Sequence, residues 1–418
     1  MMSRTSSFVL AIMIAIALGG CSKILEVDLN DGGVLVQTVS SRVTTSQNNF
    51  CFDLLETVNN ESGEQENIFL SPLSASLALT MTLNGADGET YEEMRQTLGY
   101  NNADRQEINT TCRALIDELY NLSGGIEFNL ANSIWLNDQF TLQDSFQQLN
   151  TNYFRALIES LDFSQSQECT DTINDWVEDQ THDRIQDLVK AGDIDAMTLM
   201  LLINAIYFKA DWKYQFDPEE TREQNFNLLD GNTSPCDLME LKGEFDYYSD
   251  NQIQAIDLPY ANEHYSMTVL LPRKMANIGS LLKNLDTAEL NRILAGMQPD
   301  SVILSLPKLE LEYEKSLKTA LQSMGMQRAF TGGADFSNMV QERQNDIFIS
   351  EVRQKSFLKV EETGTEAAAA TVVIMELTSI GGNEDIYMRV DHPFLFVIRE
   401  NRTGTILFVG KIMQPARR

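Results

Sequence analysis

Histidine and basic residues are scarce in this sequence of 418 residues. None of its three histidines, His182, His264 and His392, has a second histidine or a cysteine at a metal-ligand spacing, so we expect no metal site. There are 31 lysines and arginines against 61 aspartates and glutamates, which gives a formal net charge of -30. Such a surface repels phosphate backbones and anionic lipid headgroups. We therefore expect no nucleic-acid partner, and membrane contact only through an anchor.

Catalytic motifs are missing as well. The chain contains no G-x-S-x-G elbow, no H-E-x-x-H pair and no glycine-rich phosphate loop, so we expect neither an enzyme nor a bound cofactor. Cysteine is also sparse, and after Cys21 the remaining four are too few and too far apart to serve as a disulfide scaffold. Pairing is left open by their spacing; they are Cys51, Cys112, Cys169 and Cys236.

The N-terminus is typical of an export signal. Arg4 precedes an apolar run over residues 8–18, which is too short to span a bilayer comfortably. The run ends in Leu-Gly-Gly before Cys21, which resembles the bacterial lipobox that is cleaved before a diacylated cysteine. A plain signal peptide with a chance cysteine and an uncleaved anchor helix are the alternatives.

This interpretation divides the chain into three parts. We predict a signal peptide over residues 1–20, the lipidated Cys21 with a tether over residues 21–42, and a folded domain over residues 43–418. Lipid chains on Cys21 would hold the exported protein at a bacterial membrane through buried methylenes, on the periplasmic side or at the cell surface, with release outside the cell as the alternative.

Helical patterns dominate the early part of the folded domain and strand patterns the later part, which favours an α+β fold with a large sheet. We expect helices over residues 48–60, 89–98 and 317–325, and one that begins with Ser71 as N-cap and Pro72 at its first position. Apolar, β-branched or aromatic runs predict strands at residues 67–70, 128–137, 201–212, 254–260, 267–271, 302–306, 348–350 and 406–411.

One tract has a divided local preference. Residues 361–375 are rich in glutamate and alanine in their first half, which favours helix, and β-branched in their second half, which favours strand. A segment that adopts two conformations needs such a division. An ordinary alanine-rich helix or loop is the simpler interpretation of the tract alone.

The tract and the downstream segment Asp391–Ile398 resemble the hinge and the C-terminal signature of the serpins. Similar family segments occur in the correct order along residues 43–418, at Asn67–Ser74, Asn204–Trp212, Leu258–Tyr260, Leu306–Lys308, Ala334–Ser337 and Phe408–Lys411. The resemblance implies a serpin fold, with a large mixed β-sheet, helices behind it, smaller sheets and an exposed reactive-centre loop.

The resemblance also implies a mechanism. A target protease cleaves the loop and forms an acyl-enzyme, and the loop then inserts into the main sheet and traps the protease before deacylation. We expect a monomeric, irreversible inhibitor of serine proteases, with cysteine proteases as a second class of target. The alternative is a non-inhibitory serpin that acts as a binding or carrier module.

The hinge residues permit insertion. An inserting strand alternates its side chains, and the inward set must be small where the sheet parts. That set is Thr365, Ala367, Ala369, Thr371 and Val373, and Glu366 falls in the alternate set. Charged, bulky or proline residues in the inward set would instead indicate a non-inhibitory member. The hinge assignment covers Glu362, Gly364, Thr365, Glu366, Ala367, Ala368, Ala369, Ala370 and Thr371.

Counting Gly364 as the fifteenth residue before the cut predicts a scissile bond between Thr378 and Ser379, with Leu377 as an alternative. A small β-branched Thr378 favours elastase-like or subtilisin-like proteases. Trypsin-like enzymes are disfavoured, because no lysine or arginine occurs between Lys359 and Arg389.

Five further residues match family positions in the main sheet. Ser71, Ser74 and Asn204 correspond to polar groups under the strands that part, and Trp212 to a tryptophan near the end of the sheet. Gln354 stands where many members have histidine, and because glutamine does not titrate near neutral pH, we expect no histidine-driven switch there.

Overall fold

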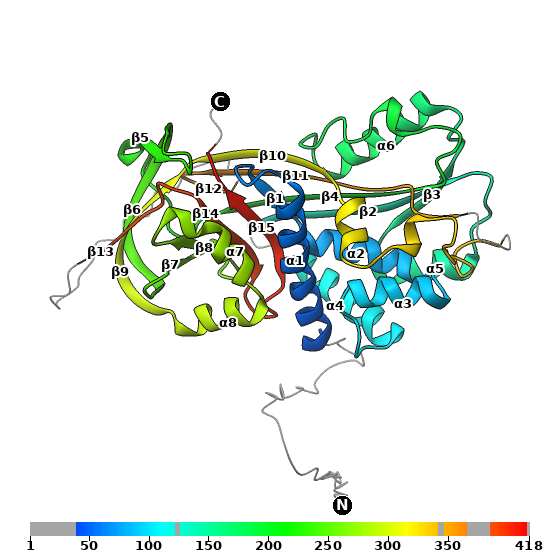
Figure 1. Ribbon diagram of the computed structural model, residues 1–418, viewed down its shortest axis with the longest axis horizontal. Coiled ribbons are helices and arrows are strands. Elements are labelled where there is room, and N and C mark those ends of the chain that lie inside the picture. The colour runs from blue at the N-terminus through cyan, green and yellow to red at the C-terminus, as the bar shows by residue number, and fades with distance from the viewer. Residues whose placement is uncertain (1–38, 122–125, 342–346, 366–384, 416–418) are drawn as a thin grey trace, which may run out of the picture. The chain divides into compact units, whose positions relative to one another are not determined.

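The structure is a computed structural model, and it describes residues 39–121, 126–341, 347–365 and 385–415. In these ranges helices are concentrated in the first half of the chain (Figure 1). Their bounds are α1 Ser41–Glu61, α2 Pro72–Leu83, α3 Gly88–Thr97, α4 Arg105–Asn121, α5 Asp144–Phe154, α6 Ser166–Gln180, α7 Ile278–Asn284, α8 Thr287–Gly296 and α9 Lys318–Ser323.

The first sheet is mixed and has six strands in the described residues. Their spatial order is β10 Leu309–Ser316, β11 Glu351–Glu361, β12 Gly364–Thr365, β4 Met200–Asp211, β2 Ile126–Asn137 and β3 Leu157–Leu161. Strands β11 and β4 pair directly and in parallel over residues 351–356 and 201–206. At their other ends the two-residue strand β12 lies between them.

The second sheet has nine strands in the described part of the chain. Its path is β1 Ile68–Leu70, β15 Ile406–Ile412, β14 Phe394–Glu400, β8 Tyr265–Pro272, β7 Ile253–Pro259, β6 Thr233–Ser249, β9 Gln298–Pro307 and β13 Ile386–Arg389, with β5 Arg222–Asn227 paired to β6. The 17-residue strand β6 makes it continuous, since its start pairs with β5 and its end with β7.

The first sheet separates two cores. On β4, Leu202, Ile206 and Phe208 face the main core, whereas Leu201 and Ile203 face a second, smaller core. Both faces are therefore apolar, which explains the long uninterrupted hydrophobic run in the sequence of β4. Figure 1 shows the strands running across the domain, with α6 on one side of the sheet and α2 on the other.

Helix α2 is buried at every position. Its small residues let the helix lie close against strands of both sheets. Ser71 is the N-cap residue and Pro72 the first helical residue, but the hydroxyl of Ser71 makes no capping bond. It donates instead to the carbonyl oxygen of Leu407 at 2.9 Å, because the buried carbonyl needs a donor.

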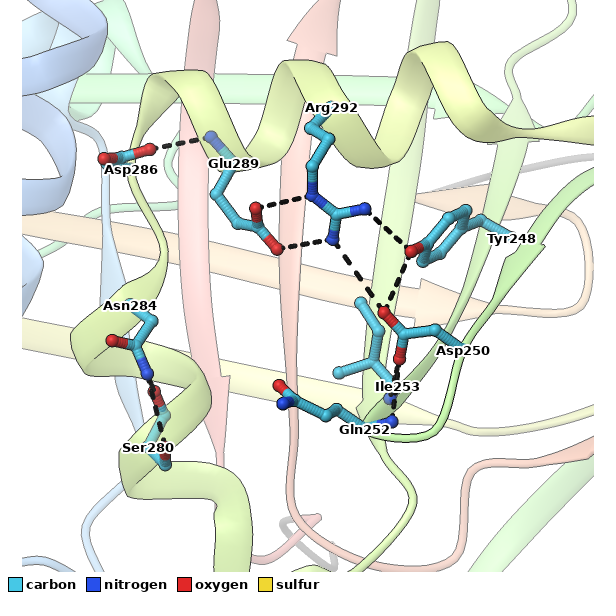
Figure 2. A network of polar contacts seen from close by, with 9 residues as sticks. All are labelled: Tyr248, Asp250, Gln252, Ile253, Ser280, Asn284, Asp286, Glu289 and Arg292. Carbon is cyan, nitrogen blue, oxygen red and sulfur yellow. Dashed lines mark hydrogen bonds and ion pairs between the residues drawn. The ribbon is translucent and has the colours of Figure 1, made fainter.

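A polar network fixes α8 against the hairpin between β6 and β7 (Figure 2). The guanidinium of Arg292 forms a bidentate ion pair with Glu289 on the same helix and donates to the hydroxyl of Tyr248 at 2.8 Å. Tyr248 in turn donates to Asp250, which also accepts from backbone amides of the hairpin turn. Because Arg292 is half-exposed, this is a surface brace.

One predicted strand is wrong. Residues 348–350 are not in a strand, and β11 begins only at Glu351. The alternation of buried and half-buried side chains there is that of a buried connection, in which the amide of Ile349 donates to the carbonyl oxygen of Ala329 and that of Ser350 to Met200. The other predicted helices and strands are confirmed, and α1 extends further toward the N-terminus than predicted.

Candidate functional site

A buried hydrogen-bond network lies where β11 and β4 pair. Gln354 of β11 stands directly opposite Asn204 of β4, and its amide nitrogen donates to the amide oxygen of Asn204 at 3.0 Å. The same nitrogen donates to the carbonyl oxygen of Ser71 at 2.8 Å, and the amide oxygen of Gln354 accepts from the backbone N–H of Ser71. One side chain thus joins the two strands to the start of α2.

Asn204 extends this network. Its amide nitrogen donates to the hydroxyl of Ser74 on α2 and, at 2.5 Å, to the amide oxygen of Asn132 on β2. All of these side chains are at most 4% exposed. Asn132 is a member that the sequence did not single out, and its own amide nitrogen has no partner among the described residues. The network therefore has one unused donor next to the junction.

The chain after β11 makes a tight hairpin into the same sheet. Gly364 and Thr365 pair antiparallel with Glu361 and Val360 of β11 on one side, and with Asp211 and Ala210 of β4 on the other. A Cβ atom on Gly364 would lie 2.2 Å from the carbonyl oxygen of Ala210. Only glycine fits at this point, because no heavy atom can approach backbone so closely.

Two aromatic residues anchor the hairpin. The buried Thr365 shares a hydrogen bond of 2.8 Å with the hydroxyl of Tyr260, and Trp212 stacks on Tyr260 with ring centroids 4.7 Å apart. Trp212 also donates twice to the turn, from its indole nitrogen to Glu361 and from its backbone N–H to Thr363. Burial raises the pKa of Tyr260 far above its usual range, so this hydroxyl stays protonated.

An ion pair closes the turn from outside. The carboxylate of Glu362 accepts from the ammonium of Lys308 and from the hydroxyl of Thr221, each at 2.8 Å. Burial opposes the ionisation of Glu362, but these hydrogen bonds outweigh it and lower the pKa of the carboxyl group. Neither Lys308 nor Thr221 carries a signal in the sequence that pairs it with Glu362.

A second anchor lies at Asp385, the first described residue after residues 366–384. Its carboxylate accepts from the ammonium of Lys242 at 2.6 Å and from the hydroxyl of Ser301 at 2.8 Å. The hydrogen bond from Lys242 is the main cause that lowers the pKa of Asp385. Strand β13 follows at once and runs parallel to β9.

The register of the β11–β12 hairpin is consistent with the register in which β11 and β4 pair directly. Where β11 and β4 pair directly, each β11 residue faces the β4 residue numbered 150 lower, as in Gln354 and Asn204. Across β12 the same offset holds, since Gly364 faces both Glu361 and Asp211. The two long strands therefore keep one relative register whether or not a strand separates them.

Two basic residues tie β11 to the connection between α6 and β4. On the face toward α6, Lys355 donates to the carbonyl oxygen of Gln186 at 2.6 Å, and Arg353 forms an ion pair with Asp193 at 3.1 Å. Since the connection continues directly into β4, these contacts bridge the junction from outside. A lateral separation of β11 from β4 must break or stretch them.

The structure brings most of the described candidates together. Ser71, Ser74, Asn204 and Gln354 form one network, and Trp212, Glu362, Gly364 and Thr365 form the hinge anchor. The predicted lipidation site, the rest of the hinge and the reactive bond lie outside the described residues; they are Cys21, Glu366, Ala367, Ala368, Ala369, Ala370, Thr371, Leu377, Thr378 and Ser379.

Comparison with known proteins decides the family. The family model described as "Serpin (serine protease inhibitor)" matches residues 45–415. The chain belongs to the serpin family. Neuroserpin of Gallus gallus is 35% identical to this serpin over 84% of the chain and 87% of that protein. Serpins are protease inhibitors rather than enzymes, and they bind target serine proteases.

Solved structures agree with the fold. The thermophilic serpin Tengpin in its native state is 30% identical, with a TM-score of 0.82 over 90% of this chain and 95% of that one. Human thyroxine-binding globulin, solved with its hormone, is 26% identical, with a TM-score of 0.83 over 90% of this chain and 99% of that one. This serpin thus shares its fold with a thermophilic serpin and with a thyroxine-binding protein.

Two other properties of the described residues concern the cysteines and the helices. Cys51, Cys112, Cys169 and Cys236 are all buried, and no disulfide joins any two of them in the described part of the chain. Among the helices described, none is both long and apolar enough to cross a membrane.

Proposed function

We propose that this serpin is an irreversible, suicide-substrate inhibitor of serine proteases that acts by inserting its cleaved loop between β11 and β4. The observation that carries the proposal is the position of β12. The first two residues of the loop already lie between the two long strands, in a register that leaves the pairing of those strands unchanged. Insertion then requires lateral separation only.

Extending that register assigns a partner to each following residue. Residues 366–374 would pair in turn with residues 359–351 of β11 and with residues 209–201 of β4. Thr371 would arrive between Gln354 and Asn204 and point to the same face. Its hydroxyl could then replace the hydrogen bond that insertion breaks between them, and the donor left unused on Asn132 is beside it.

The same register supports a role for Glu366. Its neighbours on the two flanking strands would be Lys359 and Lys209, both on the face opposite the main core. These lysines now pair with Glu361 at 2.7 Å and with Glu127 at 3.1 Å. The only charged residue among residues 365–375, Glu366, would thus enter between two ammonium groups, where opposite charges on adjacent strands are favourable.

Reaction with model proteases tests the inhibitor function. Purified protein mixed with elastase or subtilisin should form a complex that survives boiling in detergent, together with a cleaved form of higher melting temperature. Thr365→Arg is the matched control, since it buries an unpaired charge beside Tyr260 and should turn the inhibitor into a substrate. Cleavage by both enzymes with full protease activity retained would refute the proposal.

The reactive bond is proposed at Thr378–Ser379, with Leu377 as the alternative, and elastase-like or subtilisin-like enzymes are the preferred targets. Mass spectrometry of the C-terminal peptide released by elastase identifies the bond. A peptide that begins at residue 379 supports Thr378, and one that begins at residue 378 supports Leu377.

Export and anchoring are proposed on the N-terminal sequence alone. The signal over residues 1–20 would be removed, Cys21 would be lipidated, and residues 21–42 would tether the domain of residues 43–418 to a bacterial membrane. In cells, the protein should fractionate with membranes and incorporate labelled palmitate, whereas Cys21→Ser should abolish the labelling. Unchanged labelling of the variant would exclude Cys21 as the anchor.

A carrier function is the second candidate, because thyroxine-binding globulin shares the fold. The apolar cavity beside Trp212 has a volume of about 10 Å³, so this cavity has room for about one water molecule, whereas an open, polar hollow beside the start of α6 has a volume of about 510 Å³. The small inward hinge residues also favour the inhibitor. Cleavage without complex formation in the protease experiment would favour the carrier.

A further inference from the structure

We infer that His392 and Asp385 are the two ends of a latch that holds β13 on β9, and that the latch closes fully only when His392 carries two protons. The latch would keep the uncleaved loop from inserting by itself. This inference concerns the regulation of the proposed function and rests on it.

The geometry around His392 requires two donors. One ring nitrogen, Nδ1, lies 3.0 Å from a carboxylate oxygen of Asp391, and the other, Nε2, lies 2.7 Å from the carbonyl oxygen of Pro272 at the end of β8. Both partners only accept hydrogen bonds. A neutral imidazole has a single N–H and can satisfy one of them, whereas the imidazolium satisfies both.

The charged groups around the ring favour the imidazolium. Asp391 carries the carboxylate, which also accepts from the guanidinium of Arg389 at 3.0 Å. From strand β5, Asn227 donates to the carbonyl oxygen of Asp391 and Gln224 accepts from Arg389. On the side of β8 the ring meets the Pro272 carbonyl. The next residue, Arg273, is directed away from the ring, to Asp250 and Ser249.

The pKa of His392 follows from this setting. Burial favours the neutral ring, but the hydrogen bonds to Asp391 and Pro272 outweigh it and raise the pKa above its ordinary value. For a raised pKa, the stabilisation is complete below the ordinary value and is lost as the pH rises through the value in the folded protein. Alkaline solution should therefore weaken the contact with Pro272.

Chain length explains why this contact matters for the loop. An uncleaved loop that inserted from Thr365 to Thr378 would form a strand of 14 residues, about 46 Å long. The chain must then return over the same distance, which takes roughly another 14 residues, up to residue 392. Insertion of the uncleaved loop would therefore have to break the ion pair between Asp385 and Lys242, separate β13 from β9 and disrupt the hydrogen bonds of the His392 ring.

Strand β13 is a weak point in the sheet. It has four residues, it stands at the end of the strand order, and it pairs only with β9 among the described strands. Beyond that pairing, Gln254 donates to the carbonyl oxygen of Tyr387 at 3.3 Å. Met388 and Val390 are nevertheless fully buried, and the backbone N–H of Val390 donates to the carbonyl oxygen of Ser305 at 2.8 Å. The side-chain contacts at the two ends, on Asp385 and on His392, add to these interactions and raise the cost of detaching the strand.

Hydrogen exchange of the intact protein tests the latch without any protease. After correction for the exchange rate of unprotected amides, the amides of residues 386–389 should open on the order of ten times more often at pH 9 than at pH 6, because a charged hydrogen bond is lost. His392→Gln should open readily at both pH values. His264→Gln is the matched control, since His264 is exposed, and it should behave like the wild type.

The outcomes separate this inference from the proposed function. Opening of β13 that is independent of pH in the wild type, or unchanged in His392→Gln, would overturn the latch whether or not the protein inhibits a protease. If the opening follows His392 while no protease complex ever forms, the latch is supported and the inhibitor function fails. Incubation at pH 9 should also convert intact, uncleaved protein to a form of higher melting temperature faster than at pH 6.

Discussion

Reversing the charge of Glu366 should impair trapping more than cleavage. In the extended register, Glu366 enters the sheet between Lys359 and Lys209. In Glu366→Lys, three ammonium groups would instead meet on neighbouring strands. The acyl-enzyme would still form, because the reactive bond is remote from residue 366, but the early step of insertion would slow and deacylation would compete better.

The expected size follows from the pairs involved. Opposite charges on adjacent strands contribute about 0.2–1 kcal/mol each, and like charges oppose pairing by similar amounts. Two pairs that change from attraction to repulsion give about 1–4 kcal/mol. The ammonium groups of Lys209 and Lys359 remain partly exposed, at 24% and 28%. Solvent screening therefore favours the low end, on the order of a tenfold change in the ratio of trapping to turnover.

The assay is the number of inhibitor molecules consumed for each protease molecule trapped, measured by titrating elastase at low salt. Glu366→Lys should raise this number on the order of tenfold, Glu366→Gln should give an intermediate value, and the effect should shrink in high salt. Glu384→Lys makes the same change of charge outside the hinge and serves as the control. Adding Lys209→Glu to Glu366→Lys should restore part of the trapping.

Equal consumption by the wild type and Glu366→Lys at low salt would refute the register argument. So would an equal effect of Glu384→Lys, because that result would assign the change to net charge rather than to a position between two strands.

Other predictions concern the two anchors and the reactive bond. Lys308→Met should destabilise the native state by about 1–2 kcal/mol, because the buried Glu362 would lose its cation. Because the pKa of Glu362 is lowered, its carboxylate stabilises the fold at pH values above its ordinary pKa, and this stabilisation is lost as the pH falls through the pKa in the folded protein. Melting curves between pH 3 and pH 6 should therefore show that Lys308→Met loses stability at a higher pH than the wild type. Gly364→Ala should expel β12 and cost about 1–3 kcal/mol in urea unfolding, through the clash with Ala210; unchanged stability would contradict the hairpin. Thr378→Arg should extend inhibition to trypsin, and the fragment that trypsin releases should begin at residue 379.

Much of the fold was predictable because elements that are buried on both faces have long, uninterrupted apolar sequences. The long apolar runs of β4 and the fully buried α2 required little more than counting. Strand β6 was missed. Its 17 residues include Pro235 and Gly243, which interrupt the pattern, and its two halves pair with different neighbours. The strand predicted at 348–350 failed because a buried connection can alternate as a strand does.

The site was predictable in its members but not in its connections. The resemblance identified Ser71, Asn204 and Gln354, and the structure adds that one amide joins all three. The partners of Glu362 and Asp385 are 54 and 143 residues away in the chain. No local pattern records such pairs, because they arise only when distant strands meet. The shared register of β11 and β4 is likewise a property of the assembled sheet.

That shared register has a consequence for crowded conditions. Because β11 and β4 need no change of register to accept a strand between them, only the side chains of the incoming strand decide whether it fits. The two strands therefore do not distinguish a segment of their own chain from the same segment of a neighbouring molecule. Monomers could thus assemble into linear polymers, in which the loop of each molecule inserts into the first sheet of the next. A low protein concentration and the two anchors of the loop, rather than the sequences of β11 and β4, would then keep the molecules separate.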